Sequence, residues 1–191
     1  MNFFSDDLEM TLTYDALWNF LQLDDPPELR PQEGLGLDFK EDLTQDLGDH
    51  VTATANSYGG LILLGIRQTK GQSFVVADAI VGLKQAATDF KNKLENIIIS
   101  TVRPRPAFCL GIVVVPKLEG RCVAVIRVEE GLEPPYMYVQ GGQNRVSVRT
   151  PGSTRAASLD DLRQLFRKAR RVRRDAKQDT ADLGKLTLRR R

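Results

Sequence analysis

Two carboxylates and an ammonium group stand close together early in the chain. Glu33, Asp38 and Lys40 fall within residues 33–40. Such a cluster can hold a divalent cation that polarises a phosphodiester, while the lysine stabilises the developing negative charge. The alternative is a pair of solvated acids at a strand edge, with Asp38 ion-paired to Lys40. All three residues are therefore catalytic candidates, with Glu33 and Asp38 as ligands for Mg²⁺ or Mn²⁺.

A second group of polar side chains lies near residue 150. Arg149, Ser153, Thr154 and Arg155 gather guanidinium and hydroxyl donors in a glycine-containing turn that precedes a helix. The N-terminus of a helix carries a partial positive charge, so such a turn is suited to binding phosphates. The alternative interpretation is a plain turn with helix-capping residues.

Charge is distributed unevenly along the chain. Residues 1–30 carry seven acids against one arginine, residues 31–160 are neutral, and residues 161–191 carry 12 lysines and arginines against four acids. A basic segment on a neutral body favours binding to a polyanion, because each neutralised phosphate releases counterions. A solvated terminus and a contact with the acidic N-terminus are the alternatives. The further candidate phosphate-binding residues are Arg103 and Arg105, which stand beside prolines, and Arg167, Arg170, Arg171 and Arg174.

The sequence Asn-Ser-Tyr-Gly-Gly at residues 56–60 has two interpretations. Its glycines would let the backbone approach a phosphate, or it is a helix C-cap and a tight turn, which we favour. The chain contains no G-x-x-x-x-G-K-[ST] motif, so we expect no nucleotide cofactor. We expect His50 to be a packed or surface histidine rather than a general base. Tyr136 and Tyr138 are expected to pack rather than to stack on bases.

Hydrophobic periodicity predicts the elements that position these residues. Helical spacing indicates helices over residues 13–23, 46–57, 86–101 and 158–174. Apolar stretches indicate strands over residues 35–40, 61–66, 108–115, 121–128, 136–139 and 145–149, the last four as two hairpins. Alternation in the first strand places Asp38 and Lys40 together on a solvent-facing side. The predicted fold class is α+β, with one mixed, mainly antiparallel sheet flanked by helices.

Composition limits the class of protein. The chain has 191 residues, 41% hydrophobic and 27% charged, which predicts one globular unit. We expect an acidic helical segment at residues 1–27, a domain at residues 28–172 and a basic, flexible tail at residues 173–191. Two cysteines and one histidine are too few for a zinc fold. The acidic start and the lack of a long apolar run predict a cytoplasmic protein without membrane contact.

Three stretches carry a joint pattern. They are an acid, four residues and then Asp-Phe-Lys at residues 33–40; Ala-Asn-Ser-Tyr-Gly-Gly before an apolar strand ending in Gly-Ile at residues 55–66; and Arg-Thr-Pro-Gly-Ser at residues 149–153. Together they resemble the AlbA-type domain of the Schlafen family over roughly residues 28–166. In Schlafen ribonucleases the acids that match Glu33 and Asp38 are joined by a third, from just after the Gly-Ile strand. Here those positions hold Arg67 and Gln68, so the carboxylate triad is incomplete.

The resemblance implies a nucleic-acid-binding module. We expect a protein that binds the phosphates of RNA or DNA with little base specificity. The first alternative is a metal-dependent endoribonuclease that cleaves RNA of the tRNA or rRNA type. The second is a protein-interaction or transcription-regulator module. Schlafen cores have two related lobes and this chain has room for one, so a homodimer would supply the second lobe.

Overall fold

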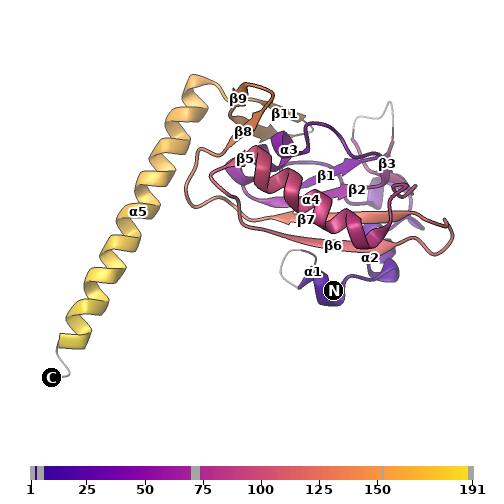
Figure 1. The fold of residues 1–191 in the computed structure, drawn as a ribbon, viewed down its shortest axis with the longest axis horizontal. Coiled ribbons are helices and arrows are strands. Elements are labelled where there is room, and N and C mark those ends of the chain that lie inside the picture. The colour runs from indigo at the N-terminus through magenta and orange to yellow at the C-terminus, as the bar shows by residue number, and fades with distance from the viewer. Residues whose placement is uncertain (1–2, 4–6, 70–73, 152, 189–191) are drawn as a thin grey trace.

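The computed structural model describes residues 3, 7–69, 74–151 and 153–188 (Figure 1). Its helices are α1 (Leu8–Thr11), α2 (Tyr14–Leu21), the 3₁₀ helix η1 (Pro27–Leu29), α3 (Leu47–Asn56), α4 (Ala87–Thr101) and α5 (Leu159–Leu188). Its strands are β1 (Leu37–Lys40), β2 (Gly60–Leu64), β3 (Ile66–Gln68), β4 (Ala77–Ile80), β5 (Val102–Arg103), β6 (Phe108–Val114), β7 (Cys122–Val128), β8 (Met137–Gln140), β9 (Gln143–Arg145), β10 (Ser147–Thr150) and β11 (Ser153–Ala156).

Four strands form the central sheet, in the order β1, β2, β7, β6. The parallel pair β1 and β2 is connected by α3, because parallel strands need a crossover. The pairs β2–β7 and β7–β6 are antiparallel, and β6 and β7 form the long hairpin that their apolar pattern predicts. The fold class is therefore α+β, as predicted, with a mixed central sheet.

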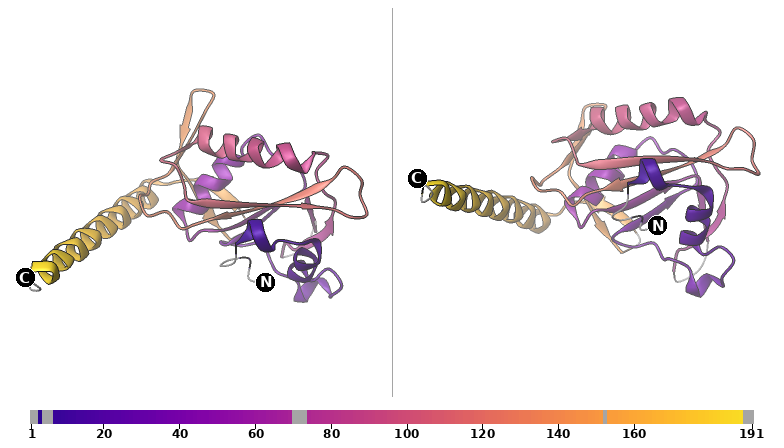
Figure 2. Two further views of the ribbon diagram at one scale, coloured as in Figure 1. Left: turned by 60° about the horizontal axis from the view of Figure 1, so that its bottom comes forward. Right: turned by 90° about the horizontal axis from the view of Figure 1, so that it is seen from below.

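Helices cover both faces of the central sheet (Figure 2). On one face Ile62 and Leu64 of β2 pack in the same cluster as apolar residues of α3 and α4. On the other face Leu61 and Leu63 pack with residues of α1 and α2. Successive residues of a strand point to opposite faces, so a strand covered on both sides must be apolar throughout. This is why β2 is a continuous apolar run.

The acidic N-terminal segment packs on the body of the protein. Its helix α2 begins where the sequence predicts, with the Thr13 hydroxyl accepting a hydrogen bond from the Ala16 backbone N–H at 3.1 Å. Leu17 and Leu21 are fully buried against the sheet. Burying such side chains contributes about 1.5–3 kcal/mol each. The segment is thus part of the same hydrophobic core as the sheet.

Three smaller sheets accompany the central one, pairing β3 with β4, β8 with both β5 and β9, and β10 with β11. The sequence predicts a single sheet and one hairpin between residues 136–139 and 145–149. The observed hairpin β8–β9 ends at Arg145, and Ser147–Thr150 pairs instead with Ser153–Ala156. Arg149 therefore lies on the β10–β11 hairpin, which packs against α3.

The last helix, α5, projects away from the body (Figures 1 and 2). It begins with the predicted capping box: Ser158 Oγ accepts from Asp161 N at 3.2 Å, and Asp161 Oδ2 accepts from Ser158 N at 2.7 Å. The helix continues to Leu188, so the domain boundary expected at residue 173 falls inside it. Arginine, lysine, glutamine and alanine in this stretch favour helix. Neither α5 nor any other helix of the described residues has the length and apolarity to cross a membrane.

Candidate functional site

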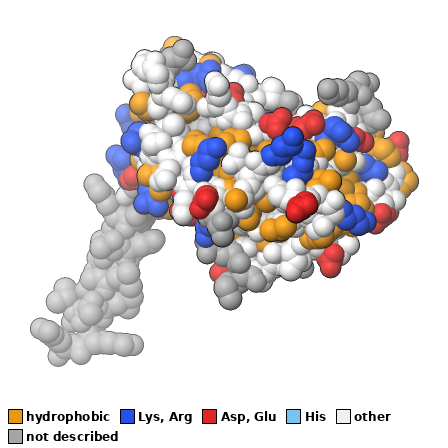
Figure 3. Space-filling model, turned by 45° about the vertical axis from the view of Figure 1, so that its right-hand side comes forward, with side chains coloured by type: hydrophobic (Ala, Val, Ile, Leu, Met, Phe, Trp, Pro, Cys, Tyr) orange, Lys and Arg blue, Asp and Glu red, His pale blue; other side chains and the backbone are white. Residues whose placement is uncertain are grey.

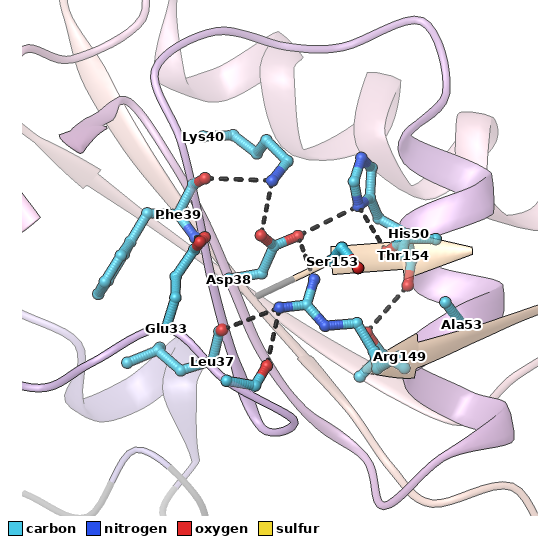
Figure 4. Close-up of polar contacts among 12 residues, drawn as sticks. Glu33, Leu37, Asp38, Phe39, Lys40, His50, Ala53, Arg149, Ser153 and Thr154 are labelled. Carbon is cyan, nitrogen blue, oxygen red and sulfur yellow. Dashed lines mark hydrogen bonds and ion pairs between the residues drawn. The ribbon is translucent and has the colours of Figure 1, made fainter. Parts of the chain in front are cut away.

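Asp38 is the centre of a buried charge network (Figure 4). The sequence places this residue on an open strand face, but only 3% of it is exposed. Lys40 Nζ lies 2.6 Å from Oδ1, and Arg149 Nη1 lies 2.9 Å from Oδ2. His50 Nδ1 lies 3.2 Å from the same Oδ2. With Glu33, these residues form what we call the Asp38 network.

Arg149 joins the β10–β11 hairpin to β1. Besides the Asp38 contact, its Nη2 donates to the carbonyls of Gly34 at 2.8 Å and Leu37 at 3.0 Å. Only 3% of the side chain is exposed. The sequence predicts Arg149 as a phosphate-binding residue. In the structure its guanidinium instead binds the carbonyls of Gly34 and Leu37 and the Asp38 carboxylate. It is a packing residue, because hairpin β10–β11 covers β1 at this point.

Glu33 closes the network on the β1 side. Its Oε1 accepts from the backbone N–H of Phe39 at 2.6 Å and from Nε2 of Gln68 at 2.8 Å. Burial and a hydrogen bond with Asp38 raise the pKa of Glu33 to about 7. Burial also favours the neutral form of Asp38, but hydrogen bonds from His50 and Glu33 and the charges of Arg149 and Lys40 outweigh it. The pKa of Asp38 therefore lies below its ordinary value.

The Asp38 network does not fit the Mg²⁺ or Mn²⁺ that the resemblance implies. Asp38 already faces two cations, and Glu33 accepts two N–H donors. At the third position of the triad, Gln68 turns its amide NH₂ toward Glu33, where a metal ligand would need an oxygen. Among the described residues, no three His, Cys, Asp or Glu side chains come together as metal ligands. A divalent cation here would have to displace Lys40 or Arg149.

The other residues of the predicted phosphate-binding turn lie on the β10–β11 hairpin. Ser153 contacts the Thr150 hydroxyl, with 2.7 Å between the two oxygens. Thr154 Oγ1 lies 3.3 Å from His50 Nδ1 and so extends the Asp38 network. Arg155 is exposed and forms a bidentate pair with Asp161, at 2.6 and 3.2 Å. The hydrogen bonds from Arg155 and Ser158 hold the pKa of Asp161 below its ordinary range.

Arg103 and Arg105 follow the end of α4. Arg103 Nη1 donates to the carbonyl oxygens of Ile99 and Val102, the latter at 2.8 Å, and so satisfies carbonyls at the helix C-terminus. Arg105 is exposed. These arginines come from a different part of the fold from Arg149 and Arg155, and Arg103 has a structural role.

The predicted arginines of the last helix share one exposed face. Steps of three and four residues place them within a narrow arc of the helix. We call this set the arginine face: Arg163, Arg167, Arg170, Arg171 and Arg174, all of them exposed. Basic and acidic side chains are mixed over the side of the body that Figure 3 shows, and several basic ones lie where α5 leaves it.

Two features of the site were not predicted from the sequence: the partners of the two acids and the exposed position of Tyr58. Gln68 and His50 are partners of the two acids, although the approach of Gln68 to Glu33 spans 35 residues of chain. Tyr58 is exposed, at 72%, whereas Tyr136 and Tyr138 are buried and pack as expected. The turn signal at residues 56–60 was enough to place Tyr58 on a loop and thus at the surface.

A comparison with protein families agrees with the motif pattern. The family model described as Schlafen, AlbA_2 matches residues 33–158. A similar solved structure is the N-terminal domain of a putative ATP-dependent DNA helicase RecG-related protein from Nitrosomonas europaea. The identity is 21%, with 73% of this chain and 92% of that chain covered and a TM-score of 0.46. No curated protein matches the chain significantly. Because the family model covers more than half of the 191 residues, the chain belongs to the Schlafen AlbA_2 family.

Proposed function

We propose that the protein binds the sugar–phosphate backbone of nucleic acid, with the arginine face of α5 as its principal contact. The observation that carries this proposal is the exposed, one-sided row of arginines on α5, which projects from a body whose residues 1–160 carry 15 lysines and arginines against 21 acids. Guanidinium groups pair with phosphate oxygens in bidentate geometry and stay charged at any physiological pH. Contacts of this kind give affinity without base specificity.

The other side of α5 supports the proposal because it fixes the orientation of the helix. Leu165 and Ala169 are buried against the body. Lys168 Nζ lies 2.6 Å from Glu130 Oε1, and Arg173 Nη2 lies 3.8 Å from Glu133 Oε1. These contacts hold the other side of the helix on the body and so leave the arginine face turned outward.

The cations of the body contribute less to such a surface. Arg149 is buried, Lys40 is bound to Asp38, and Arg121 donates to the carbonyls of Val81 and Gly82. Arg67 is exposed and paired with Asp78 at 3.1 Å, as Arg163 of α5 is with Asp160 at 2.9 Å, but among the described residues it has no row of arginines beside it. A polyanion would therefore meet its strongest positive field along α5.

Binding of labelled single-stranded RNA, tRNA-like RNA and duplex DNA across a salt series tests the proposal. The test variant carries Arg167→Gln, Arg170→Gln, Arg171→Gln and Arg174→Gln. If each arginine neutralises one phosphate, the slope of log affinity against log salt falls by roughly 3. The matched control removes the same charge from exposed positions of the body, with Arg67→Gln, Lys84→Gln, Lys93→Gln and Lys117→Gln.

The control variant is expected to keep most of the wild-type slope. Equal losses in the two variants would mean that net charge, and not α5, governs binding. A wild-type protein that binds none of the three nucleic acids contradicts the proposal and favours the protein-interaction alternative.

The predicted homodimer stays a prediction, and it would place two arginine faces on one nucleic acid. Sedimentation velocity of the full chain, with and without duplex DNA, tests it. A strict monomer under both conditions contradicts the dimer and leaves binding through α5 unaffected.

A further inference from the structure

A cleft of about 330 Å³ opens beside the start of α5. Its walls come from the turn after α3, from hairpin β10–β11 and from the first turns of α5. We infer that this cleft binds one unpaired nucleotide, with the base stacked on Tyr58 and the phosphate held by Arg155 and Lys168. The inference rests on the proposed function and names the form of nucleic acid that the protein prefers, a single strand.

Tyr58 is presented to solvent by a rigid turn. Asn56, two residues before it, is buried and donates to the carbonyls of Tyr136 at 2.8 Å and Ser147 at 2.9 Å, and it accepts from Tyr136 N at 2.7 Å. Gly59, just after it, has φ +71°, and a Cβ there would lie 2.7 Å from Glu130 N. The backbone on both sides of Tyr58 is thus fixed. Stacking on its ring would cost little conformational entropy, because the turn is already ordered.

Two cations of the cleft keep hydrogen-bond donors that a phosphate can use. Lys168 Nζ has three donors, and the structure gives it two acceptors: Glu130 Oε1 at 2.6 Å and the Ser57 carbonyl at 3.4 Å. Arg155 has five donors and makes three hydrogen bonds, two to Asp161 and one to the Ala156 carbonyl. Both side chains line the cleft.

The charges of the cleft favour a nucleotide unit over a free polyanion. Arg155 and Lys168 are matched by Asp161 and Glu130, so the cleft has no large excess of positive charge to hold several phosphates. Arg149 also lines the cleft, and its charge is paired with Asp38. The lining further includes the Tyr58 ring and the amide of Gln164. An aromatic base that carries a single phosphate group matches this composition, since the ring supplies stacking and the amide can pair with a base edge.

A duplex cannot offer such a ligand, because its bases are stacked on their neighbours and paired. An unpaired base can leave the stack and lie on an aromatic side chain, which is how single-stranded nucleic acids are commonly bound. The cleft adjoins the first turns of α5 on the side that carries Lys168, so a flexible strand whose base lies on Tyr58 would pass round the helix to reach the arginine face. The cleft would select single strands, and the helix would supply affinity for the backbone.

The test compares Tyr58→Ala, Tyr58→Phe and Phe166→Ala in the full chain. Phe166 is the matched control, because it is an exposed aromatic on α5 that does not line the cleft. The probes are a short single strand, the same strand with every base removed, and the corresponding duplex. Loss of one base–aromatic stack is expected to weaken binding of the intact strand about 5- to 100-fold. Tyr58→Phe and Phe166→Ala are expected to bind like the wild type.

The abasic strand separates stacking from other effects of the substitution. Tyr58→Ala is expected to leave binding of the abasic strand and of the duplex unchanged, since neither presents a base to the ring. An equal loss on intact and abasic strands, or no loss on either, overturns the inference while binding through α5 stands. If the wild type binds none of the probes, the inference falls together with the proposed function.

Discussion

The Asp38 network and the arginine face use the same charged side chain for opposite purposes. Arg149 pairs with Asp38 and donates hydrogen bonds to the carbonyls of Gly34 and Leu37, and only 3% of its side chain is exposed. The arginines of α5 stand on the surface of a projecting helix. A buried ion pair fixes the arrangement of the chain, because breaking it leaves an uncompensated charge in a medium of low polarity. Exposed cations cost little to hold, and a surface pair such as that of Arg163 with Asp160 at 2.9 Å is weak enough to be exchanged for a phosphate.

The largest effect is expected when Arg149 is replaced. Arg149→Ala leaves the buried Asp38 carboxylate with Lys40 and His50 as its remaining partners and deprives the carbonyls of Gly34 and Leu37 of their donor. We expect the free energy of unfolding to fall by about 3–5 kcal/mol. Urea denaturation followed by circular dichroism measures the loss. Arg167→Ala is the control, with an expected change of less than about 0.5 kcal/mol, and equal losses in both variants would contradict the assigned roles.

A smaller effect concerns the proton on Glu33. Its pKa is raised from 4.5 to about 7 in the folded chain, so the folded state binds more protons than the unfolded state between these pH values. The stability that this group contributes is complete below pH 4.5 and is lost as the pH rises through about 7. Glu33→Gln keeps an uncharged group at this position and is expected to stabilise the protein at pH 8 by roughly 1 kcal/mol, after allowance for solvent screening.

Unfolding curves of wild type and Glu33→Gln at pH 5 and pH 8 test this expectation. The two proteins should differ less at pH 5, where Glu33 is mostly protonated. Glu41→Gln, at an exposed neighbouring acid, serves as the control and should show no such difference between the two pH values. A destabilised Glu33→Gln protein at pH 8 would mean that the charged carboxylate is the form that the fold needs.

The smallest effect is expected for a single arginine of α5. Arg170→Gln should change the free energy of unfolding by less than about 0.5 kcal/mol, because the side chain is exposed. The same substitution should lower the slope of log affinity against log salt by about 1. Thermal unfolding measures the change in stability, and salt-dependent anisotropy measures the change in the slope; both can be compared with the values for Arg149→Ala. A destabilisation as large as that of Arg149→Ala would show that the two regions do not differ as we describe.

Local signals in the sequence predicted much of the fold. The cap at Thr13 and the capping box of Ser158 and Asp161 involve residues three apart, so their effects are visible within one turn of helix. The β6–β7 hairpin also forms between neighbouring segments. In each case the sequence contains both partners within a short stretch of chain.

The burial of Asp38 could not be predicted in this way. Its alternation with Leu37 and Phe39 indicates a strand with one open face, and β1 is indeed a strand. That face is closed by a hairpin about 110 residues further along the chain, which carries Arg149. A polar residue on a strand indicates solvent only where no later segment covers it, and periodicity contains no information about such a segment.

The same limit explains why the sequence predicts Arg103 and Arg149 as phosphate-binding residues together with the arginines of α5. Charge counting shows how many cations the chain has and in which segment, but not which of them donate to carbonyl oxygens of the fold. Arg149 and Arg103 both donate hydrogen bonds to backbone carbonyls of the fold. The arginines of α5 remain at the surface because they lie on the side of the helix opposite to the buried Leu165 and Ala169.

The length of the arginine face sets a scale for what it can reach. From Arg163 to Arg174, at 1.5 Å per residue, it extends for about 17 Å. A B-form strand aligned with it would pass roughly five phosphates, at 3.4 Å per phosphate. An oligonucleotide shorter than this would occupy only part of the arginine face. Affinity should therefore rise with oligonucleotide length up to that footprint and level off beyond it.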